Sequence, residues 1–209
     1  MEAVKYWFHI AISLVLYALS APAAATDARV HLQERLEALA SFSADFTQEV
    51  QGARGEILES SRGYIRLLRP NFKWVVDDPY PQVIVTEGDV LKVYDPDLEQ
   101  LIIRPLSEVM ADTPLSLLTQ EEILLGDSFE ITRIVREDDV TFVLIPTAEE
   151  TLYAEIHLHF SSRTLTGISI LDHLGQYTNI RFTQDDSAAV IQSDEFRLQV
   201  PPGTDVIGG

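Results

Sequence analysis

Two histidines and a carboxylate share one segment of this chain and could bind a metal ion. Glu155, His157 and His159 lie two residues apart, so a strand over residues 152–160 would place them on one face. Three ligands along one strand converge poorly on a single ion, and the other face of this segment is apolar. We therefore interpret the histidines as the solvent side of a half-buried strand, and we expect no metal and no cofactor.

Asp172-His173 is a second candidate, since a serine could complete a hydrolytic relay. The chain has no Gly-x-Ser-x-Gly elbow, and neighbouring residues in a strand point to opposite faces. A glycine-rich loop for phosphate is also missing from the sequence. We therefore expect that the protein is not an enzyme.

Arg69 is the polar residue with the most specific setting. It precedes Pro70, and the X-Pro corner leads into Phe72 and Trp74, which share one face of the expected strand. A guanidinium offers several donors in a fixed fork, which suits carbonyls or carboxylates at a facing helix end. Arg69 is then either a latch or an ordinary surface arginine. The two aromatic side chains either fill a core or line a hollow.

Helical spacing positions the covering elements. Leu32, Leu36 and Leu39 predict an amphipathic helix over Asp27–Leu39. A second helix is expected from the cap Thr113 past Leu118 to Gly126, with Pro114 in its first turn.

The rest of the chain alternates with period two in short runs separated by turns. These runs are residues 44–50, 63–69, 72–77, 82–86, 90–94, 100–104, 128–136, 140–145, 152–160, 165–171, 176–182 and 195–200. The pattern predicts a mainly β (α+β) protein: a strongly curved antiparallel sheet of about eleven strands, forming an unclosed half-barrel with a lid of two or three helices. The inward positions are bulky: Phe46, Ile65, Leu67, Phe72, Trp74, Leu152, Ile156 and Leu158. Such an interior is either a packed core or a lipid pocket.

Composition narrows the function. A net charge of -18 argues against nucleic-acid binding and against stable anchoring on an anionic bilayer. The chain contains no cysteine, so it has neither a disulfide nor a site for a thioether lipid anchor. Residues 1–25 read as a cleavable signal peptide, with an apolar run before Ala23-Ala24-Ala25, which leaves residues 26–209 as one domain. We predict cleavage after Ala25, with Ala23 the next candidate, and an uncleaved anchor is the alternative.

Several motifs in order resemble the outer-membrane lipoprotein carrier family, LolA. They include Arg35-Leu36-x-x-Leu39-x-Ser41-Phe42-x-Ala44-x-Phe46-x-Gln48, the 69–74 segment, Tyr94–Gln100, Phe142-Val143-Leu144-x-Pro146 and Asp172-x-Leu174-Gly175-Gln176. Two departures are visible. The corner before Phe72 is one residue short, and Lys92 stands where the family often has an aromatic residue, which would make the cavity smaller or wetter if it faced inward.

The resemblance implies a monomeric periplasmic chaperone. Such a chaperone takes acylated lipoproteins from an ABC-type release complex of the inner membrane and delivers them to an outer-membrane receptor. It also implies that Arg69 holds the lid shut, that Leu36 lies in the lid helix and that Phe72 and Trp74 lie at the acyl-chain cavity. From the apolar pattern we expect Leu39, Phe46 and Leu118 to line the same cavity. The alternatives are a carrier or sensor of another amphiphile, such as a glycolipid or fatty acid, and an assembly module with a filled interior.

Overall fold

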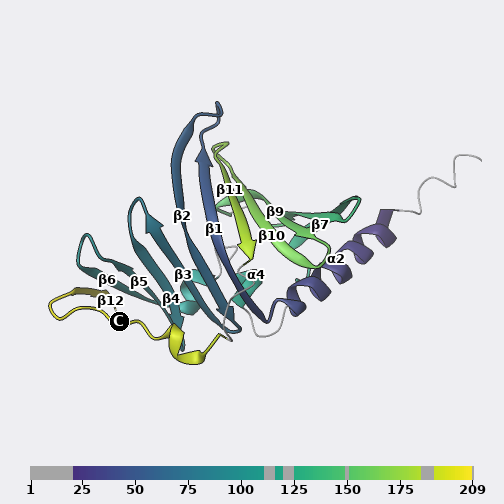
Figure 1. Ribbon diagram of the computed structural model, residues 1–209. Coiled ribbons are helices and arrows are strands. Elements are labelled where there is room, and N and C mark those ends of the chain that lie inside the picture. Colours follow the sequence, from purple (N-terminus) through teal and green to yellow (C-terminus); the bar gives the residue numbers. More distant parts are fainter. Residues whose placement is uncertain (1–20, 111–115, 120–124, 149–150, 185–190, 209) are drawn as a thin grey trace, which may run out of the picture.

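One continuous sheet contains all the strands of the described chain. The computed structural model describes residues 21–110, 116–119, 125–148, 151–184 and 191–208. Its twelve strands follow the order β12-β6-β5-β4-β3-β2-β1-β11-β10-β9-β8-β7, which leaves β12 and β7 as free edges. The sheet is strongly bent and does not close (Figure 1), so the expected unclosed half-barrel is confirmed.

The element bounds agree with most of the sequence predictions. The strands are β1 (Ser41–Gln51), β2 (Ile57–Leu68), β3 (Asn71–Asp78), β4 (Gln82–Glu87), β5 (Val90–Asp95), β6 (Gln100–Pro105), β7 (Phe129–Arg136), β8 (Asp139–Pro146), β9 (Tyr153–Ser161), β10 (Thr164–Asp172), β11 (Tyr177–Gln184) and β12 (Asp205–Gly208). The helices are α2 (Ala21–Ala38), α3 (Leu106–Met110), α4 (Ser116–Thr119) and the 3-10 helix η1 (Ser193–Phe196). None of the helices in the described part of the chain has the length and apolar character needed to cross a bilayer.

The strands form where the two-residue alternation lets one face leave water. In β1, Phe42, Ala44 and Phe46 are buried while the alternate residues Asp45 and Thr47 are exposed. The expected hairpin at Glu87-Gly88-Asp89 joins β4 to β5, and Gly88 adopts φ +61° there, which only glycine takes without strain. All neighbouring strands are antiparallel except β12, which runs parallel to β6.

The main core lies between the sheet and α2. We call the sheet face that carries Phe46 and Trp74 the concave face. Leu32 and Leu36 of α2 have no exposed surface and belong to the same buried cluster as Phe46, with Trp74 packed against it. This agrees with the expected amphipathic helix, although α2 begins earlier than predicted.

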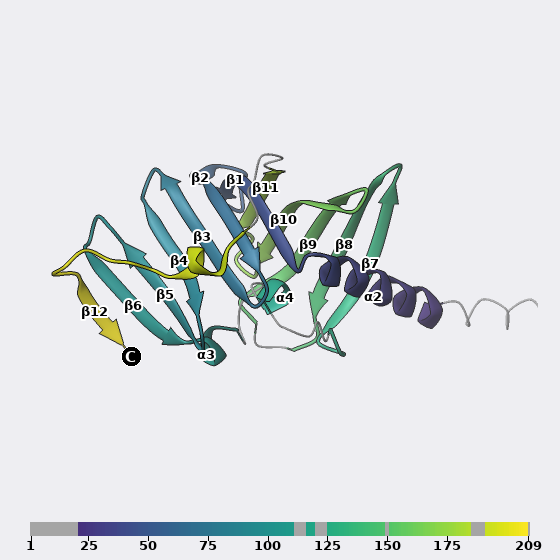
Figure 2. The same ribbon diagram turned by 60° about the horizontal axis from the view of Figure 1, so that its bottom comes forward.

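A second buried layer lies on the opposite, convex face of β3–β6. Val75, Val85, Tyr94 and Leu101 are buried but stand outside the main cluster. They are covered by residues 191–204, which we call the C-terminal strap and which cross these strands in Figure 2 before the chain enters β12. Its η1 contacts β3 and β4, and Phe196 is 2% exposed.

The strand predicted over residues 195–200 is wrong. Phe196, Leu198 and Val200 alternate as in a strand, but η1 occupies Ser193–Phe196, and the chain continues without regular structure until β12. The apolar side of this segment is used to cover the convex face rather than to extend the sheet.

Leu152 is also not an inward residue, because its side chain is 69% exposed. The register between β9 and β10 shifts so that Asp172 pairs with Tyr153 while Leu171 pairs with Glu155. The extra residue at Ala154 reverses the alternation, so Tyr153 takes the buried position. The other predicted inward residues are buried or packed against the core.

Lys92 does not enter the concave side. It pairs across the strands with Val85 and lies on the face opposite Trp74, where its Nζ is 2.7 Å from the Glu87 carboxylate. This lysine therefore neither narrows nor wets the concave side of the sheet.

The second expected helix, from Thr113 to Gly126, lies partly outside the described residues. Thr113 and Pro114 lie outside the described residues. Within the described range, α4 contains the buried Leu118, and Gly126 has φ +45° where the helix was expected to end. The short α3 was not predicted, since five residues are too few to show a helical period.

Phe196→Ala tests the strap. Removing a fully buried phenyl ring costs about 3–5 kcal/mol through lost burial and a residual cavity. We expect the free energy of unfolding, measured by urea denaturation, to fall by about 3 kcal/mol. The exposed Leu98→Ala should change it by less than about 0.5 kcal/mol. Equal losses in the two variants would show that the strap is not a stabilising layer.

Candidate functional site

Arg69 joins two helices to the sheet. Its Nη2 donates a hydrogen bond to the Leu36 carbonyl in α2 at 2.8 Å, and its Nε donates to the Leu118 carbonyl in α4 at 3.1 Å. Both carbonyls lie in the last turn of their helices, and the Leu36 carbonyl also accepts from the Leu39 amide at 3.1 Å. One guanidinium therefore holds both covering helices, as the latch hypothesis requires.

The β2–β3 corner fixes Arg69 in this position. The Arg69 amide donates to the Ala40 carbonyl at 2.9 Å, which ties the corner to the connection between α2 and β1. The Phe72 amide donates to Thr86 Oγ1 at 2.8 Å, and Thr86 is buried. Both sides of the corner are thus anchored despite its short length.

Burial has the largest effect on the pKa of Arg69. Partial removal from water lowers the pKa of Arg69, and the nearby Glu37 carboxylate partly offsets this by raising it. The guanidinium stays charged at neutral pH, since its pKa lies far above 7. An open pocket of about 410 Å³ adjoins it, lined by Glu37, Ala40, Arg69 and Pro70.

Two further arginines fasten α2 to the other half of the sheet. Arg29 donates to the Phe129 carbonyl at 2.9 Å and also to the Gly126 carbonyl. Arg35 donates to the Ser162 carbonyl in the β9–β10 turn. Its guanidinium also lies 5.5 Å from the centre of a buried phenyl ring in β9. Sequence reasoning missed both arginines, because carbonyl partners more than 90 residues away leave no local signal.

The predicted cavity residues come together on the concave face. Five of them are buried in one cluster with Trp74 packed against it: Leu36, Leu39, Phe46, Phe72 and Leu118. The Phe46 and Trp74 rings stack with centroids 3.8 Å apart, so no hydrocarbon chain can pass between them. In this closed arrangement the aromatic side chains fill the space, and an apolar ligand would have to displace them or the lid.

Phe182 is a member of this aromatic cluster that the sequence did not reveal. Its ring lies edge-on to Trp74 with centroids 6.5 Å apart, and it contacts Phe42 in the same way at 5.4 Å. The position follows from register, since Phe46 of β1 pairs directly with Phe182 of β11. Sequence alternation places it on one face of β11 but cannot say which strand is its neighbour.

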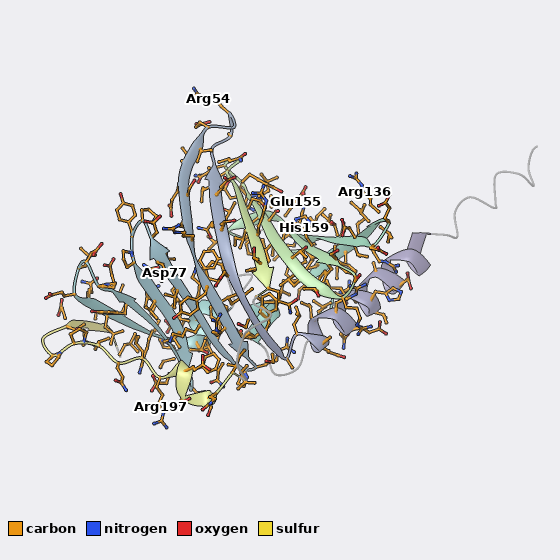
Figure 3. All side chains as sticks on the ribbon, in the orientation of Figure 1. Arg54, Asp77, Arg136, Glu155, His159 and Arg197 are labelled. Carbon is orange, nitrogen blue, oxygen red and sulfur yellow. The ribbon has the colours of Figure 1, made fainter. Side chains whose placement is uncertain are left out.

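The histidine segment forms a polar row on the convex face (Figure 3). His159 Nδ1 lies 3.1 Å from Thr141 Oγ1 and its Nε2 lies 2.9 Å from Ser169 Oγ, while His157 Nε2 lies 2.8 Å from Glu155 Oε2. Among the described residues, no group of three or more His, Asp or Glu side chains could hold a metal ion. The interpretation of these histidines as the polar side of a half-buried strand therefore fits their contacts.

Asp172 and His173 have structural partners. Asp172 Oδ1 accepts hydrogen bonds from the amides of Leu174 and Gln176, both at 2.8 Å, which closes the β10–β11 turn. His173 Nε2 lies 3.3 Å from Thr151 Oγ1 and is exposed.

This arrangement defines a class of protein: an open half-barrel whose apolar concave face lies under helices held by arginine hydrogen bonds. A solved structure supports this fold, that of an uncharacterized conserved protein from Thermus thermophilus. It matches with a TM-score of 0.52 and 12% identity over 86% of this chain and 98% of that chain.

Residues 37–199 match the family model described as "Outer membrane lipoprotein carrier protein LolA", and the chain belongs to this family. The outer-membrane lipoprotein carrier protein of Chromohalobacter salexigens is 36% identical over 208 residues, which cover 99% of this chain and 98% of the relative. The protein of the same name from Azotobacter vinelandii is 34% identical and covers 94% of this chain and 95% of the relative.

Arg69→Leu tests the latch. It removes the two hydrogen bonds to the Leu36 and Leu118 carbonyls, and a hydrogen bond from a charged donor contributes about 1.5–3 kcal/mol. We expect a loss of about 3 kcal/mol in unfolding free energy and faster amide hydrogen exchange in residues 32–38. Arg62→Leu is the matched control in β2, the strand that leads to Arg69, because Arg62 is exposed and its ion pair with Asp78 spans 3.7 Å. Unchanged exchange in the Arg69 variant would contradict the latch.

The environment of His159 predicts that it lowers the free energy of unfolding in acid. Burial, and secondarily His157, lowers the pKa of His159 in the folded chain. The unfolded chain then binds more protons just below its ordinary pKa of about 6.5, so stability falls as the pH drops through this value. His159→Gln should lose less unfolding free energy than the wild type between about pH 8 and pH 5. The exposed His173→Gln should behave as the wild type, and identical pH profiles for all three proteins would contradict the assignment.

Proposed function

We propose that this protein is a periplasmic chaperone that binds the acyl chains of lipoproteins released from the inner membrane and delivers them to an outer-membrane receptor. Membership of the carrier family and the names of the relatives support it. The single observation that carries it is the Arg69 bridge, because it joins two covering helices over an apolar face with hydrogen bonds that can be broken and remade.

The energies of the lid suit a ligand-driven opening. Each hydrogen bond from a charged donor contributes about 1.5–3 kcal/mol. Each leucine withdrawn from the core loses about 1.5–3 kcal/mol of burial, and α2 buries Leu32 and Leu36 completely. Packing therefore holds the lid at least as firmly as Arg69 does. An acyl chain that replaces the leucine contacts compensates for this loss, and Arg69 then decides between the two arrangements.

The free energy of acyl-chain burial also explains why such a carrier needs partner proteins for loading and unloading. A chain of about 16 carbons gains roughly 12 kcal/mol on leaving water, at about 0.8 kcal/mol per CH₂. The same chain is already buried in a bilayer, so the carrier has no net gain in extracting it. Loading therefore needs an ATP-driven release complex in the inner membrane, and unloading needs a receptor that binds the cargo more tightly.

The charge and the leader agree with a carrier that moves between membranes. A net charge of -18 disfavours adsorption on anionic lipid surfaces. A cleaved signal peptide over residues 1–25 would bring the chain to the periplasm and leave residues 26–209 as one domain, acting as a monomer without a cofactor. The role is binding and transfer, with no catalytic step assigned to the chain.

Mass spectrometry of material that copurifies with the protein tests the cargo. Triacylated N-terminal peptides are expected in protein isolated from the periplasm. Glycolipids or free fatty acids in their place would instead indicate a carrier of another amphiphile.

A reconstituted transfer assay tests the role of Arg69. We expect Arg69→Leu to accept lipoprotein but to hand over about tenfold less to outer-membrane acceptors, because loaded and closed states no longer differ by the two hydrogen bonds. Arg62→Leu should transfer normally. Transfer by Arg69→Leu at the wild-type rate would overturn this part of the mechanism. Depletion of the protein should make lipoproteins accumulate at the inner membrane.

A further inference from the structure

A straight row of apolar side chains crosses the concave face of the sheet to its β12 edge. Each member is the direct cross-strand partner of the next, and direct partners share a face. The row runs Ile65, Trp74, Ile84, Val93, Ile102 and Ile207, through β2, β3, β4, β5, β6 and β12. We call it the cross-strand row.

Exposure along the row increases away from the lid. Ile65 is fully buried and Trp74 packs against the core, whereas Ile84, Val93 and Ile102 are partly exposed and stand outside the core cluster. Ile207 is 46% exposed. The row therefore begins inside the aromatic cluster and ends in solvent.

The row is one residue wide where it leaves the lid. Two residues further along β4, β5, β6 and β12 on one side are polar side chains: Gln82, Asp95, Gln100 and Asp205. On the other side the corresponding positions are Thr86, Leu91 and Arg104, where Leu91 is buried and the short α3 packs on β5 and β6. The apolar track is thus bordered by polar or covered positions on both sides.

This shape decides what can occupy it. A stable protein partner buries about 800 Å² on each side over a broad patch, which a single file of side chains bordered by carboxylates and amides does not provide. A bilayer is disfavoured by the same carboxylates. An unbranched hydrocarbon chain needs only a narrow apolar track. Four strand spacings of about 4.8 Å make the row from Trp74 to Ile207 about 19 Å long, which suits a long acyl chain.

We propose that one acyl chain of the cargo leaves the aromatic cluster at Trp74 and lies across β4, β5 and β6 along the cross-strand row, reaching Ile207 in β12. This inference rests on the proposed function, since it names the subsite of an acyl chain that the lid region already holds. The affinity for a cargo would then depend on the length of its acyl chain. Shorter chains remain under the lid, and longer ones gain contacts with each further strand.

Binding of peptides with one saturated N-terminal acyl chain, lengthened stepwise from about 8 to about 18 carbons, tests the row. For the wild type, each added CH₂ should raise the affinity by up to about fourfold until the chain passes the edge of the sheet. In Ile102→Asn and Ile207→Asn the rise should stop at shorter chains, and the longest chain should bind about tenfold more weakly.

Val206→Asn is the matched control. Val206 neighbours Ile207 in the same strand, is 53% exposed and lies on the opposite face, where it pairs with Leu101. Its length dependence should equal that of the wild type. A photoreactive group at the end of the longest chain should label β5, β6 or β12.

The outcomes separate the two proposals. If the wild type binds no acylated peptide of any length, the proposed function fails. If it binds them but Ile102→Asn and Ile207→Asn keep the wild-type length dependence, or if the photoreactive group labels only α2, the cross-strand row is not the subsite and the proposed function stands.

Discussion

The arrangement depends on one charged group kept partly out of water. The Arg69 guanidinium must remain ionised while burial opposes its charge, and two helix carbonyls in place of water satisfy its donors. The same contact fixes α2 and α4 relative to the β2–β3 corner, which carries Phe72. A neutral residue at this position would remove both hydrogen bonds that join the corner to the helices, and a lysine offers a point charge where a planar fork is needed.

The two halves of the bent sheet are covered on opposite faces. On the strands β7–β10 the concave face is sealed by α2 and its arginines, and the convex face carries His159 and its polar partners. On the strands β3–β6 the convex face is sealed by the C-terminal strap, and part of the concave face stays open. Each half of the sheet therefore has one stabilised face, and the half that lies away from the lid leaves apolar surface free for a ligand.

Local pattern predicted most strands and the N-terminal helix well, because alternation and helical spacing follow directly from which side chains leave water. Failures occurred where a local pattern had two structural solutions. Phe196 alternates with its neighbours as in a strand yet lies in a 3-10 turn, and the bulge at Ala154 that exposes Leu152 has no sequence signature. Partners far along the chain, such as Phe182 for Phe46, depend on strand order, which alternation does not encode.

The strap also constrains the order in which the molecule can be assembled. Val75, Val85 and Tyr94 obtain their cover only from residues synthesised about a hundred positions later, and β1 must wait for β11 to find its second neighbour. Closing such distant pairs is slow relative to local hairpins. A nascent or translocating chain consequently exposes apolar strand surface before the segments that cover it have been made. Newly made protein should therefore need protection from aggregation until β11 and the strap have emerged.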